Sequence, residues 1–181
     1  MLTLASSSQT RAKILTENGI KFKQISFDFN ENDVSDQCEP HIYVQNVVKS
    51  KKEQFLKLYP DVKNVIFADS CVACDGKILG KAKNKQDAIN MLNLQSGNIA
   101  SVFTAMIFLA EDFEFINVSE TAYKFANFKE EDIKEYIKNG EYKDKAGAMM
   151  VEGFNKKYII KQIGNTSTAR GLNVELLKAY L

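Results

Sequence analysis

A carboxylate and a lysine stand where the surrounding sequence is apolar. Asp69 lies inside the run Val-Ile-Phe-Ala-Asp-Ser-Cys-Val-Ala, so its charge must be paired, hydrated in a cleft or bound to a metal. Lys51 follows Val44 by seven residues and precedes Phe55 by four, which places it on the inward face of a helix, where it requires an anion. Sheet proteins place catalytic groups where a strand ends at an open cleft. The structural alternatives are a strand-end cap or turn for Asp69 and, for Lys51, a side chain that extends along the edge of the apolar face into water.

A second group of polar residues lies near the start of the chain. Arg11, one of two arginines, falls at a predicted strand-to-helix turn beside Ser6, Ser8 and Thr10. Hydroxyls, backbone N–H groups and a guanidinium at the start of a helix can together hold a phosphate. The alternative is a serine that only caps the helix.

Cysteine and histidine supply a competing interpretation. Cys38, His41, Cys71 and Cys74 read as C-x-x-H followed by C-x-x-C, a set that could hold a structural zinc ion. The chain would then be a zinc-stabilised regulatory or partner-binding module without catalysis. Residues three apart in a strand point to opposite faces, however, which favours buried, inert thiols at Cys71 and Cys74. A lone histidine without a G-x-S-x-G motif also argues against a serine–histidine triad.

Apolar periodicity predicts the elements that position these groups. Helices are expected from the turn after Ser6-Ser7-Ser8 to near Gly19 and over 41–59, 84–95, 129–138 and 171–181. Strands are expected over 2–5, 21–29, 65–74 and 158–163, with a hairpin at Asp75-Gly76 and two or three antiparallel strands over 99–127. Mixed strands and helices without a strict βαβ rhythm indicate an α/β or α+β domain on a mixed sheet.

Composition excludes several partner classes. The 181 residues carry 24 basic and 23 acidic side chains, a formal charge of +1, which argues against a nucleic-acid binder with a charged footprint. Apolar residues make up 45% of the chain, enough for a real core. No run approaches the roughly 18 apolar residues of a membrane span, and the first residues lack the pattern of a secretory signal. We therefore expect a cytoplasmic protein with reduced thiols and no membrane partner.

Six features match those of one protein family in order and spacing. They are LASSSQTRAKIL, Glu31 after a strand, Lys51 on its helix, FADSCVACDGKILGKA, DAINMLNLQSGNIASVFTA and DKAGAMMVEGF. With these features the chain resembles, over nearly its whole length, the Maf family of nucleoside triphosphate pyrophosphatases. The resemblance implies an α/β fold of the Maf and inosine triphosphatase-like kind, with a mixed, elongated sheet flanked by helices and two lobes around a central cleft. Residues 1–181 would form this single domain.

The resemblance also implies an activity and its cofactor. Family members hydrolyse a nucleoside triphosphate to the monophosphate and pyrophosphate with a divalent cation, Mg²⁺ or Mn²⁺. They act in the cytoplasm in nucleotide metabolism, including the removal of non-standard nucleotides, and are often homodimers. The family's association with septum formation suggests a further reading, in which the chain acts in division control through a protein partner.

Site residues follow from the resemblance position by position. Asp69 is implied as the proton acceptor, and Asp69 and Glu31 as the carboxylates that serve the metal or the attacking water. The positions that hold the triphosphate are Ser8, Arg11, Lys51, Lys81 and Lys145, the last within the D-K-A-G loop that begins at Asp144. Thr10, Ser70 and Glu152 fall at positions that tune base selectivity.

The chain departs from the family pattern at several of these positions. The usual S-x-S-P-R-R is here Ser-Ser-Ser-Gln-Thr-Arg, and the common G-K-P is Gly80-Lys81-Ala82. Glu152 replaces the glutamine of the branch that prefers dTTP and UTP. The segments SGNI and Glu152-Gly153-Phe154 look more like the branch that prefers 7-methyl-GTP. A carboxylate there could accept two N–H bonds from a guanine edge. The aromatic residue of that branch is absent at Thr10, so the preferred base stays open.

Overall fold

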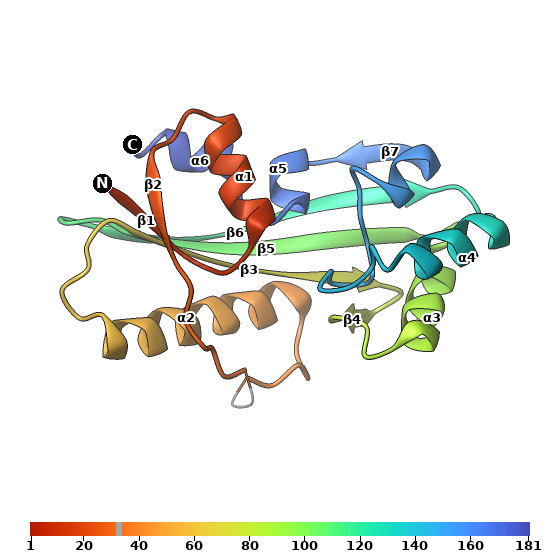
Figure 1. Cartoon of the computed structure of the whole chain (residues 1–181), viewed down its shortest axis with the longest axis horizontal. Coiled ribbons are helices and arrows are strands. Elements are labelled where there is room, and N and C mark those ends of the chain that lie inside the picture. The colour runs from red at the N-terminus through yellow and green to blue at the C-terminus, as the bar shows by residue number, and fades with distance from the viewer. Residues whose placement is uncertain (32–33) are drawn as a thin grey trace. The chain divides into compact units, whose positions relative to one another are not determined.

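The computed structural model describes residues 1–31 and 34–181 as an α/β fold. Its strands are β1 (Leu2–Ala5), β2 (Phe22–Ile25), β3 (Val65–Cys74), β4 (Lys77–Leu79), β5 (Ile99–Leu109), β6 (Glu114–Phe125) and β7 (Ile159–Ile163). Within the described residues they form one seven-stranded sheet in the order β2-β1-β3-β5-β6-β7, with β4 beside β3 (Figure 1). β1 runs parallel to β2 and β3, while β4 and β7 are antiparallel to their partners. The predicted mixed sheet is confirmed.

Helices flank the sheet. They are α1 (Gln9–Glu17), α2 (Pro40–Leu58), α3 (Lys85–Gln95), α4 (Glu130–Asn139), α5 (Thr166–Ala169) and α6 (Val174–Lys178), together with the 3₁₀ helix η1 (Phe154–Tyr158). The chain divides into two compact units. The first unit comprises Met1–Ser70, Thr104–Ser119 and Asn165–Leu181, and the second comprises Cys71–Phe103 and Glu120–Gly164.

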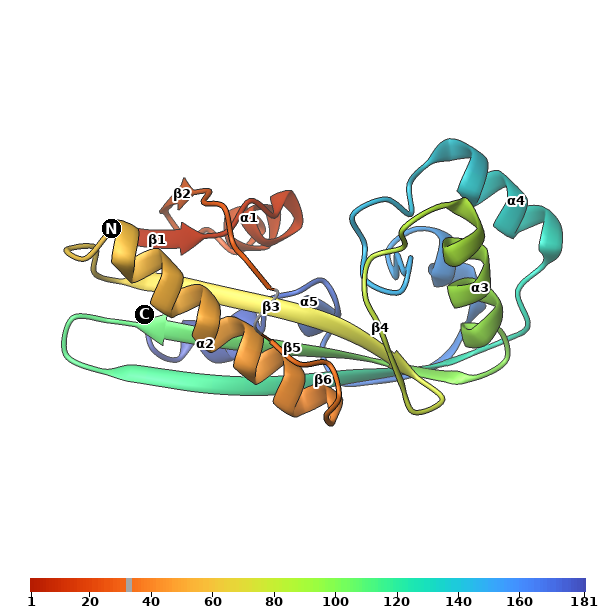
Figure 2. The same ribbon diagram turned by 90° about the horizontal axis from the view of Figure 1, so that it is seen from below.

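Side chains of β3 point alternately to its two faces and pack into the core of the first unit. Ile66 and Ala68 are buried in a cluster with residues of α1 and α6, including Leu15 and Leu177. Phe67 points to the other face, where its ring packs edge-on against Phe55 of α2, 5.3 Å between centroids. In Figures 1 and 2, α2 accordingly covers one face of these strands, and α1 and α6 cover the other. Side chains of successive strand residues point to opposite faces, so each face of β3 meets a different helix.

The start, the buried face and the end of helix α2 all follow from signals in its sequence. A proline occupies its first turn, where the missing N–H costs nothing. Its buried residues Val44, Val47, Val48 and Phe55 recur at helical spacing. The helix ends at Leu58, two residues before Pro60, which cannot continue it.

The second unit contains the predicted hairpin. Asp75 and Gly76 have φ of +50° and +70°, the positive values that a type I′ turn requires, and they join β3 to β4. Asn84 caps α3 by accepting a hydrogen bond from the Asp87 backbone N–H.

Two predicted elements were too long. The strand expected over 21–29 is β2, which ends at Ile25, and the following segment leaves the sheet. The helix expected over 171–181 is only α6, Val174–Lys178, preceded by Gly171 at a φ of +104° that no helix contains. The region 99–127 forms two strands, β5 and β6.

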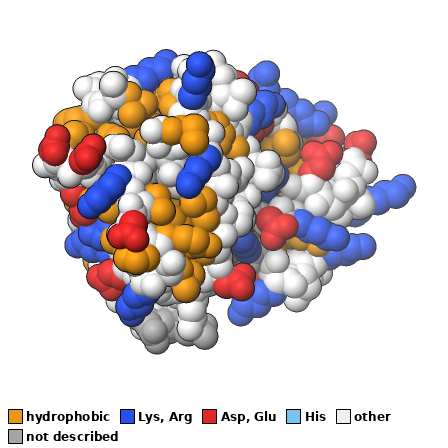
Figure 3. All heavy atoms as spheres, turned by 60° about the vertical axis from the view of Figure 1, so that its left-hand side comes forward, with side chains coloured by type: hydrophobic (Ala, Val, Ile, Leu, Met, Phe, Trp, Pro, Cys, Tyr) orange, Lys and Arg blue, Asp and Glu red, His pale blue; other side chains and the backbone are white. Residues whose placement is uncertain are grey.

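An aromatic cluster lies at the surface of the first unit. The Tyr180 ring contacts those of Phe113 and Phe115, and Tyr180 and Phe113 are 49% and 43% exposed. Figure 3 shows hydrophobic side chains gathered on the face that carries the chain ends, with charged side chains around them. Among the helices of the described residues, none combines the length and apolar character needed to cross a bilayer.

Candidate active site

β3 extends past the end of β1 and carries Asp69 there. β1 stops at Ala5, whereas β3, paired with it at Thr3–Val65 and Leu4–Ile66, continues to Cys74. Asp69 shares the α2-facing side with Phe67 because the two are two positions apart along the strand. Its position five residues before the strand end contradicts the alternative of a strand-end turn.

Lys51 of α2 is the partner of this carboxylate. Its ammonium group donates a hydrogen bond to Oδ1 of Asp69 and forms an ion pair with it. The two side chains are 15% and 14% exposed, so solvent still reaches them. The same ammonium lies 4.9 Å from the centroid of the Phe29 ring. The inward lysine therefore meets an anion, as predicted, rather than only extending into water.

Arg11 of α1 is held on the other side of β3. Its Nε donates to the Gly171 carbonyl at 2.8 Å, Nη1 to Ser6 Oγ at 3.2 Å, and Nη2 to Ser70 Oγ at 3.3 Å. Burial lowers the pKa of Arg11 from its ordinary value, and the nearby Asp69 charge opposes that shift. An arginine nevertheless stays charged at neutral pH. Asp69 thus forms an ion pair with Lys51 and is close enough for its charge to act on Arg11, although the hydrogen bonds of Arg11 lie on the other side of β3.

Ser8 is the N-cap of α1. Its Oγ accepts a hydrogen bond from the Arg11 backbone N–H at 3.3 Å, so Ser8 does cap the helix. The Gln24 amide donates to the Ser6 carbonyl at 2.7 Å and fixes the turn before the helix. Thr10 is half-buried in the first helical turn, beside Arg11. Phosphate binding by Ser8 and base selection by Thr10 stay predictions.

Glu31 lies in the connection between β2 and α2. It is exposed, and its carbonyl accepts a hydrogen bond from the Val34 N–H at 2.9 Å. Among the hydrogen bonds and ion pairs found over residues 1–31 and 34–181, none joins its carboxylate to Asp69. Phe29, two residues earlier, contacts Lys51, so this connection passes near the Lys51–Asp69 pair.

The second unit pairs the two segments that carry its predicted phosphate ligands. Lys81 and Ala146 form an antiparallel bridge, and the Gly147 N–H donates to the Gly80 carbonyl at 2.8 Å. The predicted ligand Lys145 and Asp144, at a φ of +60°, precede this contact. Gly147, at +61°, approaches so closely that an added Cβ would lie 2.9 Å from the Val72 side chain.

Glu152 is an exposed residue of the second unit whose charge acts on two tyrosines. Burial, and secondly the charge of Glu152, raise the pKa of Tyr123 to about 12. Burial also raises the pKa of Tyr136, with the charges of Glu141 and Glu152 as smaller causes.

The structure does not form the proposed zinc site. Cys71 and Cys74 are buried, His41 is exposed, and the Cys74 thiol donates to the carbonyls of Leu94 and Ile99 at 3.4 Å each. Over the described ranges, no three His, Cys, Asp or Glu side chains gather in a group that could hold a metal ion. The zinc interpretation is therefore wrong for this fold. A hydrated Mg²⁺ needs no such group, because one or two carboxylates plus substrate phosphates suffice.

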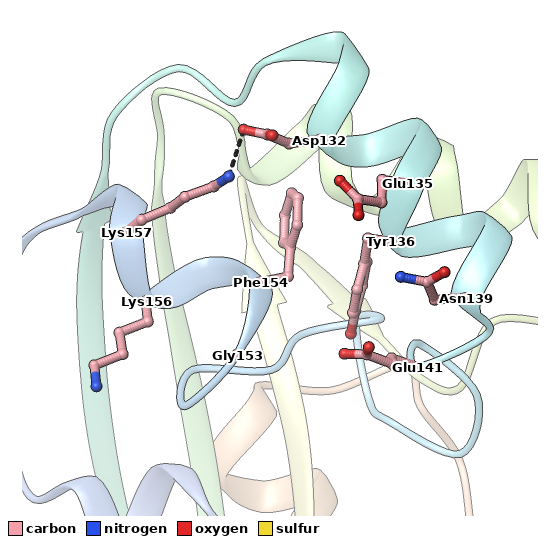
Figure 4. A pocket seen from close by; sticks show the side chains of 9 residues that line it. All are labelled: Asp132, Glu135, Tyr136, Asn139, Glu141, Gly153, Phe154, Lys156 and Lys157. Carbon is pink, nitrogen blue, oxygen red and sulfur yellow. Dashed lines mark ion pairs between the residues drawn. The ribbon is translucent and has the colours of Figure 1, made fainter.

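The second unit contains a cavity of about 610 Å³ whose lining includes none of the predicted residues, although its lining residue Gly153 directly follows Glu152. Its lining consists of Asp132, Glu135, Tyr136, Asn139, Glu141, Gly153, Phe154, Lys156 and Lys157 (Figure 4). The rings of Tyr136 and Phe154 stack 4.7 Å apart inside it, and Asp132 pairs with Lys157 at its edge. Three carboxylates against two lysines give the lining a net negative charge, which disfavours a polyphosphate.

Sequence reasoning missed residues that hold Arg11. Gly171 lies 160 positions away along the chain, and Thr104 contacts Ser70, which in turn accepts a hydrogen bond from Arg11. The one available signal was the glycine after Arg170 inside an expected helix, a position that suggests a break.

Comparisons with known proteins agree with the resemblance. The protein family described as Maf-like protein has a profile that matches residues 1–181. A nucleoside triphosphate pyrophosphatase of Campylobacter jejuni is 45% identical, with both chains covered completely. Proteins of the same name from Nitratiruptor and Helicobacter pylori are 41% and 34% identical, over 98% and 99% of this chain and 96% and 94% of theirs. On this evidence of full-length similarity, the chain belongs to the Maf family.

Proposed function

We propose that the protein hydrolyses a nucleoside triphosphate between its α and β phosphates, releasing the monophosphate and pyrophosphate. Family membership makes it a hydrolase of the nucleoside triphosphate pyrophosphatase class. The observation that carries the finer proposal is the combination of Arg11, Lys51 and Asp69 in the first unit, beside the turn before α1. Residues 1–181 would act as one catalytic domain, which the full-length match supports.

Cations are the first requirement of this reaction. A triphosphate carries about four negative charges, and positioning and neutralising them supplies most of the catalysis of phosphoryl transfer. Arg11 presents a planar fork suited to phosphate oxygens, and Lys51 a point charge. Ser8, Lys81 and Lys145 are proposed as further triphosphate ligands.

Asp69 is proposed as the general base. It accepts a proton from water while the water oxygen bonds to the α phosphorus and the bond from that phosphorus to the bridging oxygen breaks. Pyrophosphate leaves with the electron pair of that bond. Lys51 pairs with Oδ1 of Asp69 and would also contact the incoming phosphates. Its interaction with Asp69 would then weaken, and the carboxylate could accept the proton.

A divalent cation, Mg²⁺ or Mn²⁺, fits the carboxylates of this region. Asp69 is partly exposed and its ion pair with Lys51 engages one oxygen, while Glu31 is exposed on the connection that passes near it. These hard oxygen donors would hold the ion. When bound, the ion would neutralise phosphate charge and polarise the reacting phosphoryl group.

Base selection is proposed for Glu152, with Thr10 as the second candidate position. At the third position that the resemblance implies, Ser70, the hydrogen bond from Arg11 favours a role on the phosphate side of the substrate. A carboxylate can accept two N–H bonds from a guanine edge and favours a cationic, methylated base, which makes 7-methyl-GTP the first candidate substrate. A homodimer and a cytoplasmic location, both implied by the resemblance, belong to the same proposal. A role in division control through a protein partner is an alternative to it.

The test is Asp69→Asn. We expect the fold to persist and kcat for pyrophosphate release to fall at least ~10²-fold, the low end for lost acid–base catalysis. Asp112→Asn, which alters an exposed carboxylate of the same unit, is the matched control and should leave kcat unchanged. Circular dichroism on heating checks the fold. Near-normal turnover by Asp69→Asn would remove Asp69 from the role.

A further inference from the structure

We propose that Ser70, Thr104 and Gly171 fix the guanidinium of Arg11, so that Ser70 is a positioning residue for Arg11 rather than a reader of the base. The inference rests on the proposed function, in which Arg11 is a ligand of the triphosphate. It assigns the C-terminal segment around Gly171 a part in substrate binding.

The hydroxyl groups form a chain with a single direction. Thr104 Oγ1 donates to the Thr168 carbonyl at 2.8 Å. A hydroxyl has one hydrogen, so toward Ser70 Oγ, 2.8 Å away, Thr104 can only accept. The Ser70 hydrogen is therefore directed at Thr104, and Ser70 presents its lone pairs to Nη2 of Arg11.

Burial enforces this direction. Thr104 and Thr168 are 0% and 1% exposed, so water cannot supply an alternative donor or acceptor at the far end of the chain. Hydrogen bonds in such a low-dielectric environment polarise one another. The consequence is that Ser70 has no hydrogen left for a nucleobase.

Gly171 closes the other edge of the guanidinium. Its φ of +104° favours glycine, and its carbonyl accepts from Nε of Arg11 at 2.8 Å. An added Cβ would lie 3.3 Å from that Nε and 3.4 Å from Ser70 Oγ, so the residue sits against both partners. Together with Ser6, the described contacts occupy three of the five N–H groups of Arg11. Two N–H groups remain for phosphate oxygens.

This arrangement predicts a distinct kinetic signature. Arg11 would contact phosphates, which every nucleoside triphosphate shares, so loosening it should weaken all substrates equally. A residue that reads the base would instead change the order of preference. Thr104, being fully buried, can affect substrate only through its neighbours. These are Ser70 and the Thr168 carbonyl, which also accepts a hydrogen bond from the Gly171 N–H.

The experiment compares Ser70→Ala, Thr104→Val and the double variant over a panel of canonical, methylated and deaminated triphosphates. We expect each single variant to raise KM about 10-fold for every substrate, the low end for a lost hydrogen bond to a charged group, with the order of preference unchanged. The double variant should be no worse than the more affected single one, because both break the same chain. Thr104→Ser keeps the hydroxyl and should restore the wild-type KM.

Two controls separate positioning from simple destabilisation. Thr3→Val makes the same change at another buried threonine of the first unit and should leave KM unchanged. In an Arg11→Lys background, which lacks the fork, Ser70→Ala and Thr104→Val should each change KM less than ~2-fold. A full ~10-fold loss in that background, or an altered order of bases in Ser70→Ala, would overturn the inference.

Binding of inorganic tripolyphosphate, measured by calorimetry, distinguishes this inference from the proposed function. If the wild type hydrolyses no triphosphate, the proposed function fails, while weaker tripolyphosphate binding by Ser70→Ala and Thr104→Val still supports the positioning role. If both variants bind tripolyphosphate as the wild type does, the positioning role is wrong, whatever the turnover.

Discussion

Asp69 and Ser70 are neighbours in sequence, but their side chains serve different helices. Asp69 meets Lys51 of α2, and Ser70 meets Arg11 of α1. The odd placement of Asp69 and Lys51 within apolar patterns made both predictable from the sequence. The Gly171 carbonyl could not be predicted, because a backbone acceptor carries no residue-type signal and 160 positions separate it from Arg11.

At the same scale, Glu152→Gln tests base selection. Replacing one carboxylate oxygen by an amide nitrogen turns an acceptor into a donor, so contacts with a guanine edge should be lost. We expect kcat/KM for guanine-type triphosphates to fall roughly 10-fold relative to the other bases, with less effect on the remaining rates. The measurement is pyrophosphate release from a base panel with Mg²⁺ and with Mn²⁺.

Glu131→Gln is the control for this prediction, since it changes another exposed glutamate of the second unit. An order of bases that is the same in Glu152→Gln and in the wild type would argue that Glu152 does not read the base.

Local sequence patterns set the ends of some helices and strands but not of others. α2 and β3 were predicted nearly to their ends, because their periodicity and the prolines of α2 are local signals. β2 was predicted too long, since Phe27 and Phe29 continue the alternation but pack as rings beside Phe55 and Lys51 instead of joining the sheet. Tertiary contacts decide such ends.

Gly147 gives a prediction about the loop that carries Lys145. Gly147→Ala would place a Cβ 2.9 Å from Val72 at a φ of +61°, so both overpacking and left-handed backbone should destabilise it. We expect the free energy of unfolding to fall by about 2 to 4 kcal/mol in urea titrations.

Gly19→Ala isolates the backbone part of that cost. Gly19 has a φ of +69°, and no atom lies within 4 Å of an added Cβ. Gly19→Ala should therefore lower the free energy of unfolding by only about 1 kcal/mol. If Gly147→Ala and Gly19→Ala lower the free energy of unfolding equally, the contact with Val72 adds no destabilisation.

The contact of α4 with η1 predicts a dependence of stability on pH. Hydrogen bonds from Lys157 and Tyr158 hold the pKa of Asp132 below its ordinary value of 3.8. A depressed folded-state pKa stabilises the fold above the ordinary value, and this contribution is lost as the pH falls through the folded pKa. Asp132→Asn should therefore be less stable than the wild type at pH 7, and the difference should close in acid below about pH 3.8.

Urea titrations across this range provide the measurement, and Lys157→Met is the reciprocal variant. It should remove part of the same acid dependence, and the double variant should add little to either single change. A gap between wild type and Asp132→Asn that stays constant from pH 7 into acid would contradict the assignment.

At the scale of the whole molecule, the near-balance of 24 basic and 23 acidic groups argued against a nucleic-acid partner but gave no information about the site. The sequence predicted a mixed sheet and its family. It could not predict the strand order, because pairing of β1 with both β2 and β3 depends on contacts far apart in the chain.

The three thiols report on the fold as a whole. Cys71 and Cys74 are each 2% exposed, and burial, then the charge of Asp75, raises the pKa of the Cys74 thiol, whereas Cys38 is half-buried. A disulfide-exchange reagent should thus modify one thiol quickly in the native protein and all three in denaturant. EDTA should not alter the number of thiols that react quickly in either state. Rapid reaction of all three thiols in the native protein would contradict the described packing.

The opposite orientations of Asp69 and Ser70 restrict how the gene can change. Inserting or deleting one codon within β3 ahead of this pair would turn the carboxylate toward α1 and the hydroxyl toward α2. Both partnerships would be lost together, and no single compensating substitution could rebuild them. Length variation in functional descendants of this chain should accordingly fall in its connections, while the number of residues from Val65 to Ser70 stays fixed.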